Sequence, residues 1–136
     1  MPGRLVHFEL PARDTERAKT FYSALFGWRF EPWSGQDDYY MVDGEPAGAV
    51  YAVENDENGP VVYFDVEEIG AAIEDVRALG GSAHGKTAIT GVGWIVRCRD
   101  TEGNAFSLFE ADATVAADDD EAEIAWEDGE EVGEPR

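Results

Sequence analysis

Two side chains near the start of the chain have the types and the spacing for proton transfer. His7 and Glu9 lie two residues apart in RLVHFEL, a stretch that alternates and is rich in strand-forming residues. Successive side chains of a strand point to opposite faces, so His7 and Glu9 share one face. A carboxylate beside an imidazole favours the imidazolium form, and the two make a possible general acid/base pair. The alternative is structural: a hydrogen-bonded His7, with Glu9 paired to Arg29 or another basic residue.

The residues after this strand predict an amphipathic helix and three further strands. Asp14 can accept hydrogen bonds from the first N–H groups of the helix, and Gly27 can adopt the left-handed conformation that ends it. Strand-like stretches follow at residues 28–33, 39–42 and 47–53, separated by the turn-forming SGQDD and DGEP. The unit is therefore βαβββ. The apolar face expected for the helix consists of Ala18, Phe21, Tyr22, Leu25 and Phe26.

The same order of elements begins again after the loop NDENGP. Residues 61–66 predict a strand, and a helix follows that ends at Gly80–Gly81. Strands are expected at residues 82–90, 93–99 and 104–110, with DTEGN as the last turn. Aligning the two units gives an internal repeat of about 54 residues. We expect an α+β domain over residues 1–112, in which modules of about 4–53 and 60–110 form a cupped mixed sheet. The apolar face of the second helix consists of Ile69, Ala72, Ile73, Val76 and Leu79.

The net charge of −20 is the most unusual feature of the composition. Thirty acidic residues face ten basic ones, of which only Lys19 and Lys86 are lysines. Such a surface repels nucleic acid and anionic membranes, so neither is an expected partner. An acidic, lysine-poor surface is typical of halophilic cytosolic proteins, and an acidic mesophilic protein is the alternative. Residues 113–136 are expected to form a disordered acidic tail. Within this tail, Ile124 and Trp126 are the residues that could dock onto the folded body.

Neither a disulfide nor a membrane span is expected. Cys98 is the single cysteine and lies between Arg97 and Arg99 in a predicted strand, where we expect it to be inert. No apolar run reaches the roughly 18 residues of a membrane helix, and MPGRLVHFEL does not have the pattern of a signal peptide. We expect a cytoplasmic location.

Two sequence stretches resemble the vicinal oxygen chelate superfamily, which includes glyoxalases, bleomycin resistance proteins and ring-cleaving dioxygenases. RLVHFEL…RDTERAKTFYSALFGW is similar to the first module of that superfamily, and DTEGNAFSLFE is similar to the hairpin that closes the second. The resemblance covers residues 4–110 and is closest to glyoxalase-related proteins described as predicted lyases. It implies a homodimer and a small-molecule ligand, while the chemistry has to be argued from the site.

The resemblance also implies where a metal ion would bind. Metal-using members hold it with two His and two carboxylates from equivalent strands of the two modules. His7 occupies the first position, but Val61 and Ser107 occupy two others, and residues 47–53 contain no acidic residue. Using Glu110 in place of Ser107 would require a register slip that turns its neighbours to the wrong face. We therefore expect no metal and no other cofactor.

Two functions follow from this reading. The first is a metal-independent enzyme, a lyase, isomerase or cofactor-free monooxygenase, in which His7 and Glu9 transfer a proton in a cavity between the modules. The second is a protein that binds or sequesters a small, partly apolar molecule without changing it. Tyr63 either orients a ligand oxygen or packs in the strand. The residues expected to contact the ligand are Trp28, Tyr51, Tyr63, Trp94, Ser107 and Phe109.

Overall fold

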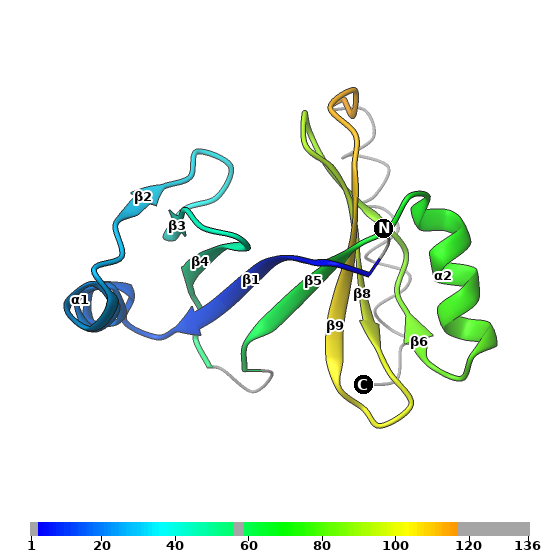
Figure 1. The fold of residues 1–136 in the computed structure, drawn as a ribbon, viewed down its shortest axis with the longest axis horizontal. Coiled ribbons are helices and arrows are strands. Elements are labelled where there is room, and N and C mark those ends of the chain that lie inside the picture. Colours follow the sequence, from blue (N-terminus) through cyan, green and yellow to red (C-terminus); the bar gives the residue numbers. More distant parts are fainter. Residues whose placement is uncertain (1–2, 56–58, 117–136) are drawn as a thin grey trace. The chain divides into compact units, whose positions relative to one another are not determined.

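The described residues fold into two α+β units, each with one helix and a set of parallel and antiparallel strands (Figure 1). In this computed structural model residues 3–55 and 59–116 are described, so the expected disorder of the acidic tail beyond Ala116 lies outside the described residues. The described residues from Leu5 to Val62 form one compact unit, and the second comprises those from Tyr63 onward together with Gly3 and Arg4. The boundary falls within the strand Val61–Asp65, which we count with the second unit. We call them the first and the second module. Within the described residues, no helix is long and apolar enough to cross a membrane.

The first module has the predicted βαβββ order. Its elements are β1 (Leu5–Ala12), α1 (Thr15–Phe26), β2 (Phe30–Pro32), β3 (Tyr39–Val42) and β4 (Ala47–Ala52). The strands are ordered β2-β3-β4-β1, with β1 parallel to β4 and the other pairs antiparallel. A chain can make a parallel pair only by crossing over, and the residues from α1 to β3 provide this crossover.

Both predicted ends of α1 are confirmed. The side chain of Asp14 accepts a hydrogen bond from the Arg17 N–H at 3.0 Å. Gly27 has a φ of 76°, and its N–H donates to the Ser23 carbonyl at 2.8 Å. The expected apolar face is mostly not buried, because Thr15 is the only buried residue of the helix. Phe21, Leu25 and Phe26 are 59%, 58% and 57% exposed.

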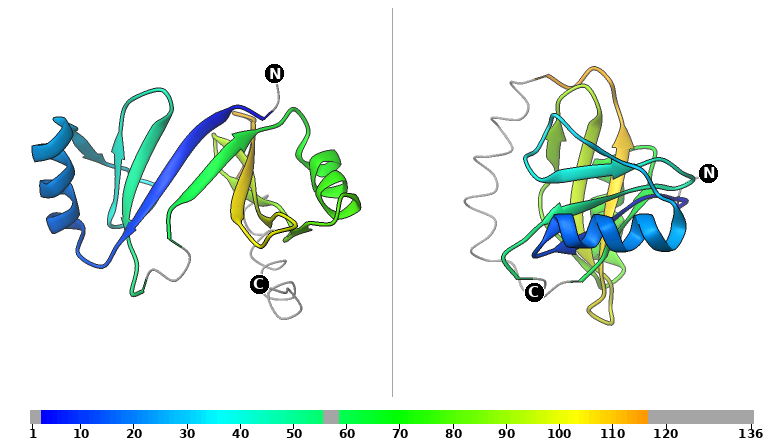
Figure 2. Two further views of the ribbon diagram at one scale, coloured as in Figure 1. Left: turned by 60° about the horizontal axis from the view of Figure 1, so that its bottom comes forward. Right: turned by 90° about the vertical axis from the view of Figure 1, so that its left-hand side faces the viewer.

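The second module repeats the order with one change. Its elements are β5 (Val61–Asp65), α2 (Ile69–Ala78), β6 (Ser82–Ala83), β7 (Thr87–Ile89), β8 (Gly93–Arg99) and β9 (Ala105–Ala111). β5 is parallel to β9, β9 is antiparallel to β8, and both β6 and β7 pair with β8. Figure 2 shows the helix of each module on one face of the strands of that module.

The prediction of one continuous strand over residues 82–90 is wrong. Ala83 pairs with Cys98 and Thr87 pairs with Ile95, so a step of four residues on one strand lies opposite a step of three on the other. The additional residue makes a bulge, which interrupts the ladder at His84–Lys86 and separates β6 from β7. Sequence periodicity does not reveal such an insertion.

The core of the second module lies between α2 and its sheet. Ile69 and Ile73 of α2 pack with buried side chains of β6, β8 and β9, which confirms the predicted inner face of the helix. Leu79 is the exception at 79% exposed, because the helix ends at Ala78 and Leu79 is its cap residue. The other buried members of this core are Ala83, Val96, Cys98 and Leu108.

The described residues extend past the last strand into the start of the acidic segment. Val115 is buried, and its carbonyl accepts a hydrogen bond from the Gly91 N–H at 3.0 Å. The Val92 carbonyl accepts from the Asp112 N–H at 3.0 Å. Residues 112–115 are therefore held by backbone hydrogen bonds to the loop before β8.

The setting of Cys98 predicts an unreactive thiol. Burial raises the pKa of Cys98 to about 12, so at pH 8 only roughly one thiol in ten thousand is the nucleophilic thiolate. Ellman's reagent at pH 8 is expected to label the native protein far more slowly than the protein unfolded in guanidinium chloride. Rapid, complete labelling of the native protein would contradict the burial of this side chain.

Candidate functional site

The strand register of the first module sets which side chains share a face with His7. In the parallel pair, His7 lies beside Ala47 and Glu9 beside Ala49. In the antiparallel pair, Tyr39 lies beside Tyr51. Because side chains alternate along a strand, His7, Glu9, Tyr39 and Tyr51 all lie on the same face of this sheet. The expectation that His7, Glu9 and Tyr51 come together therefore agrees with the register.

Three of these side chains form a continuous hydrogen-bonded chain. The Tyr39 hydroxyl donates to Glu9 Oε2 at 2.6 Å, and His7 Nε2 lies 2.9 Å from the same hydroxyl oxygen. His7 Nε2 and Glu9 Oε2 are 3.8 Å apart, too far for a direct hydrogen bond. We call His7, Tyr39 and Glu9 the β1–β3 triad, in which the phenol is the link between base and carboxylate.

The triad is largely removed from solvent. The side chains of His7 and Glu9 are 20% and 12% exposed, and Tyr39 is buried. Hydrogen bonds to an ionised group are stronger in such surroundings than in water, because fewer water molecules compete for the carboxylate. Glu9 thus has the phenol of Tyr39 on β3 as a hydrogen-bond partner, whereas the structural alternative paired it with Arg29 or another basic residue.

Small residues on β4 leave room for the Tyr39 side chain to reach across this strand. β3 and β1 are both neighbours of β4, so their backbones lie roughly 9–10 Å apart. On the shared face β4 presents the methyl groups of Ala47 and Ala49 beside His7 and Glu9, and the ring of Tyr51 beside Tyr39. A larger side chain at Ala49, which is fully buried, would occupy the path of the phenol.

Aromatic rings extend the triad along the same face. The ring of Trp33 lies 5.2 Å from that of Tyr39, and the ring of Tyr51 lies 6.0 Å from it, measured between centroids. These distances are typical of packed aromatic pairs. The face therefore combines one base, one carboxylate and a row of rings, which suits a flat and partly apolar ligand.

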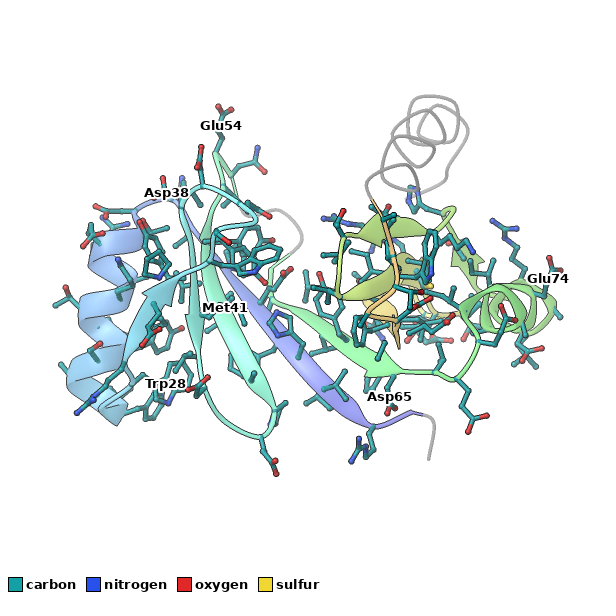
Figure 3. All side chains as sticks on the ribbon, turned by 90° about the horizontal axis from the view of Figure 1, so that it is seen from above. Trp28, Asp38, Met41, Glu54, Asp65 and Glu74 are labelled. Carbon is teal, nitrogen blue, oxygen red and sulfur yellow. The ribbon has the colours of Figure 1, made fainter. Side chains whose placement is uncertain are left out.

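The structure places Trp28 away from the triad. Its ring packs at 5.4 Å from Tyr22 and 5.1 Å from Phe26 of α1, and at 6.0 Å from Phe8. Phe8 alternates with His7 and Glu9 along β1, so Trp28 belongs to the opposite, helix-covered face (Figure 3). Gly48 lies beside Phe8, and a Cβ at this position would collide with the Phe8 ring.

The remaining expected ligand contacts belong to the second module and divide between its two faces. Tyr63 pairs with Ser107, and Phe109 follows two residues later, so these three share one face. Trp94 lies on the other face, packed against the core beneath α2 and with the Lys86 ammonium 4.0 Å above its ring. Within this module Trp94 therefore does not join the other three.

The donor atoms at the family's metal positions do not fit a metal ion. His7 is the one ligand of the expected set, while Val61 and Ser107 stand at two positions and β4 carries no acidic side chain. Over residues 3–55 and 59–116, no group of three or more His, Cys, Asp or Glu could hold a metal ion. Divalent ions need several such donors around one point.

Glu110 has a structural role that the sequence did not reveal. Its Oε1 accepts a hydrogen bond from the Ile69 N–H at 2.9 Å, at the first turn of α2. The Glu68 carboxylate accepts from the Gly70 and Ala71 N–H groups at 3.1 and 2.7 Å. Two carboxylates thus satisfy three N–H groups that have no partner within the helix, and their charge complements the helix dipole.

Two modules of this order, each with its first and last strand in parallel, define a protein of the vicinal oxygen chelate class. Residues 4–44 match the family model described as bleomycin resistance protein-like N-terminal. A glyoxylase-like domain-containing protein from Didymella fabae is 32% identical over 118 residues, which are 78% of this chain and 92% of that protein. The chain belongs to this glyoxalase-like family, within the glyoxalase/bleomycin resistance protein/dioxygenase superfamily, as the sequence resemblance predicted.

Solved structures agree with this fold. Methylmalonyl-CoA epimerase from Mycobacterium tuberculosis has a TM-score of 0.62 at 19% identity, covering 81% of this chain and 88% of its own. A glyoxalase/bleomycin resistance protein/dioxygenase superfamily member from Vibrio splendidus 12B01 has a TM-score of 0.60 at 14% identity, covering 79% and 98%. At these identities the likeness concerns the fold and leaves the reaction to be argued from the side chains.

The hydrogen bond of Glu110 predicts a measurable loss of stability. Glu110→Ala removes the acceptor of the Ile69 N–H and is expected to lower the free energy of unfolding by about 1–2 kcal/mol in urea titrations. Glu110→Gln keeps an acceptor oxygen and should lose less. Glu74→Ala is the matched control, because Glu74 is exposed on the same helix (Figure 3). Equal stability of the Glu110→Ala and Glu74→Ala variants would rule out this cap.

The donor set predicts that no divalent metal binds tightly. Calorimetric titration of the chelator-treated protein with Ni²⁺, Mn²⁺, Fe²⁺ and Zn²⁺ in concentrated KCl is expected to show no stoichiometric site. The chain used should end at Ala116, which keeps the buried Val115 and removes acidic residues that bind metal nonspecifically. A tight site that disappears in His7→Ala would contradict this prediction and identify His7 as a metal ligand.

Proposed function

We propose that this protein is a metal-independent enzyme that transfers a proton to or from a small, partly apolar molecule at His7. The observation that supports the proposal is the β1–β3 triad, because it joins a base to a carboxylate in largely buried surroundings. A carboxylate behind an imidazole stabilises the imidazolium that forms when the base takes a proton. The reaction class is proton removal next to a carbonyl group. In an isomerase a proton then returns to the enolate, and in a lyase the enolate expels a leaving group from the adjacent carbon.

Binding without reaction is the second candidate. The row of Trp33, Tyr39 and Tyr51 rings favours it, since aromatic side chains hold flat or cationic ligands against their rings without further chemistry. Sequestration of this kind needs the rings but does not need the hydrogen bond from Tyr39 to Glu9. The two candidates therefore differ in whether the triad or only the aromatic row is required.

The wider expectations from composition belong to the same proposal. The net charge of −20 supports a protein adapted to concentrated salt and located in the cytoplasm. A homodimer is the assembly that we propose, supported by family membership. Size-exclusion chromatography with light scattering in molar KCl measures the mass directly.

A deuterium-exchange assay tests proton transfer without advance knowledge of the substrate. The protein in D₂O is incubated with a panel of small ketones and thioesters, including methylmalonyl-CoA, which a structurally similar epimerase holds in its complex. Deuterium that enters the carbon next to the carbonyl is detected by NMR. Catalysed exchange supports the enzyme, whereas saturable binding of an unchanged ligand supports sequestration.

His7→Ala is expected to reduce the exchange rate by about 10²–10⁴-fold, because the base is lost. Its melting temperature should fall by only a few degrees, since loss of the hydrogen bond to Tyr39 costs about 1 kcal/mol. His84→Ala is the matched control, because His84 is the other histidine and lies between β6 and β7. Full exchange activity in folded His7→Ala would exclude His7 as the base.

A further inference from the structure

One side of α1 presents large apolar side chains to the solvent, next to a basic residue. Phe21 and Leu25 are 59% and 58% exposed. Arg17, Phe21 and Leu25 follow one another at intervals of four residues, which makes them neighbours on the surface of the helix. We call these three residues the α1 stripe. Apolar side chains that are exposed side by side in this way mark a surface that binds another chain, whereas singly scattered ones do not.

The stretch that contains α1 is basic although the protein is acidic. Residues 13–29 contain four of the ten basic residues of the chain and only two of the thirty acidic ones. Glu16 pairs with Lys19 at 2.9 Å, and Asp14 accepts a hydrogen bond from the Arg17 N–H at 3.0 Å. Neither contact involves the Arg17 guanidinium. The α1 stripe therefore favours an occupant that has both apolar side chains and carboxylates, and its positive charge repels the same stripe of a second copy.

A segment of this composition lies near the end of the same sequence. Residues 121–128, EAEIAWED, contain Ile124 and Trp126 together with four acidic residues, and they lie outside the described residues. We call them the Ile124–Trp126 segment. Residues two apart are separated by at most about 7 Å in any chain, and Phe21 and Leu25 are about 6 Å apart along the helix axis. The two apolar residues of the segment can therefore match the spacing of those on the α1 stripe.

We propose that the Ile124–Trp126 segment of one copy of this chain binds to the α1 stripe of a second copy. Ile124 and Trp126 cover the two apolar side chains of the stripe, and an adjacent carboxylate pairs with Arg17. Each copy has one stripe and one segment, so two copies satisfy both sites and the assembly closes as a dimer. This inference rests on the homodimer proposed above and names its contact, and it does not depend on the reaction at His7.

The place where the described chain ends favours a second copy as the source of the segment. The Val115 carbonyl accepts a hydrogen bond from the Gly91 N–H at 3.0 Å, so the chain is held in the second module up to this residue. Residues 116–120 then precede the segment and allow a reach of at most about 22 Å. A second copy can approach α1 from any direction and bring its own segment without this limit.

Two pairs of substitutions in the full chain test the two sides of the contact. Phe21→Ser with Leu25→Ser removes the apolar part of the α1 stripe. Ile124→Ser with Trp126→Ser removes the apolar part of the segment. Each pair is expected to raise the dissociation constant of the dimer by about 10²–10⁴-fold, because two large apolar side chains lose their burial at each site. Leu79→Ser is the matched control and should leave the dimer intact, since Leu79 is 79% exposed at the end of the other helix.

Size-exclusion chromatography with light scattering measures the mass in about 1 M KCl, where the repulsion between copies is screened. We expect two chains for the original protein and for Leu79→Ser, and one chain for each double variant at the same concentration. An unchanged far-ultraviolet circular dichroism spectrum verifies that each variant is folded. A dimer that persists in the Ile124→Ser, Trp126→Ser protein would overturn the inference and leave the homodimer standing. An original protein that is monomeric would remove both the inference and the homodimer.

Mixing the two double variants tests whether the stripe and the segment bind each other. The mixture contains one intact stripe on one variant and one intact segment on the other. A heterodimer is therefore expected at concentrations at which each variant alone is still monomeric. A mixture that stays monomeric at those concentrations would overturn the assignment of the two surfaces to each other.

Arg17→Glu tests the contribution of charge. It places a carboxylate opposite those of the segment, so the dissociation constant is expected to rise by roughly tenfold in about 0.1 M KCl and by less in 1 M KCl. An affinity equal to that of the original protein at both salt concentrations would overturn the pairing of Arg17 with the segment.

Discussion

The parallel pairing of β1 with β4 is the constraint on which the candidate site depends. Its register puts His7 and Glu9 beside Ala47 and Ala49, on the face that also carries Tyr39. A shift by one residue would turn His7 and Glu9 toward the α1 side, since strand side chains alternate with a period of two. The small side chains of β4 then matter as much as the polar ones, because they leave the path by which a phenol from β3 reaches β1.

The second module uses the same arrangement of strands for a different purpose. Its parallel pair places Tyr63 beside Ser107, where the first module has Glu9 beside Ala49. The other face of this sheet is closed by α2, which Glu110 of β9 fastens at its first turn. A carboxylate near the end of the last strand is thus used to hold a helix, and the polar chemistry of the described residues is concentrated on β1 and β3. Equivalent backbone positions of the two modules have different roles because they carry different side chains.

Much of the fold was predictable because its signals are local. Asp14 and Gly27 mark the ends of α1, and the helical spacing of Ile69 and Ile73 marks the inner face of α2. Tyr39 was not singled out as a site residue, because its role depends on two registers. The DGEP turn helps to set the pairing of β3 with β4, but nothing in the sequence states the register between β1 and β4, which are joined by a long crossover. The bulge between Ala83 and Thr87 and the contact of Glu110 with Ile69 are likewise products of tertiary pairing, which local periodicity does not record.

The open face of α1 gives the chain two opposing tendencies in solution. Phe21, Leu25 and Phe26 offer apolar surface to the solvent, while the net charge of −20 makes copies of the chain repel one another. The repulsion extends about 10 Å in 0.1 M salt and only about 3 Å in 1 M salt, whereas attraction between apolar surfaces is not screened by ions. The ionic strength of the surroundings therefore controls the colloidal association of this protein. It sets how closely another surface can approach α1 before charge repulsion exceeds the apolar attraction.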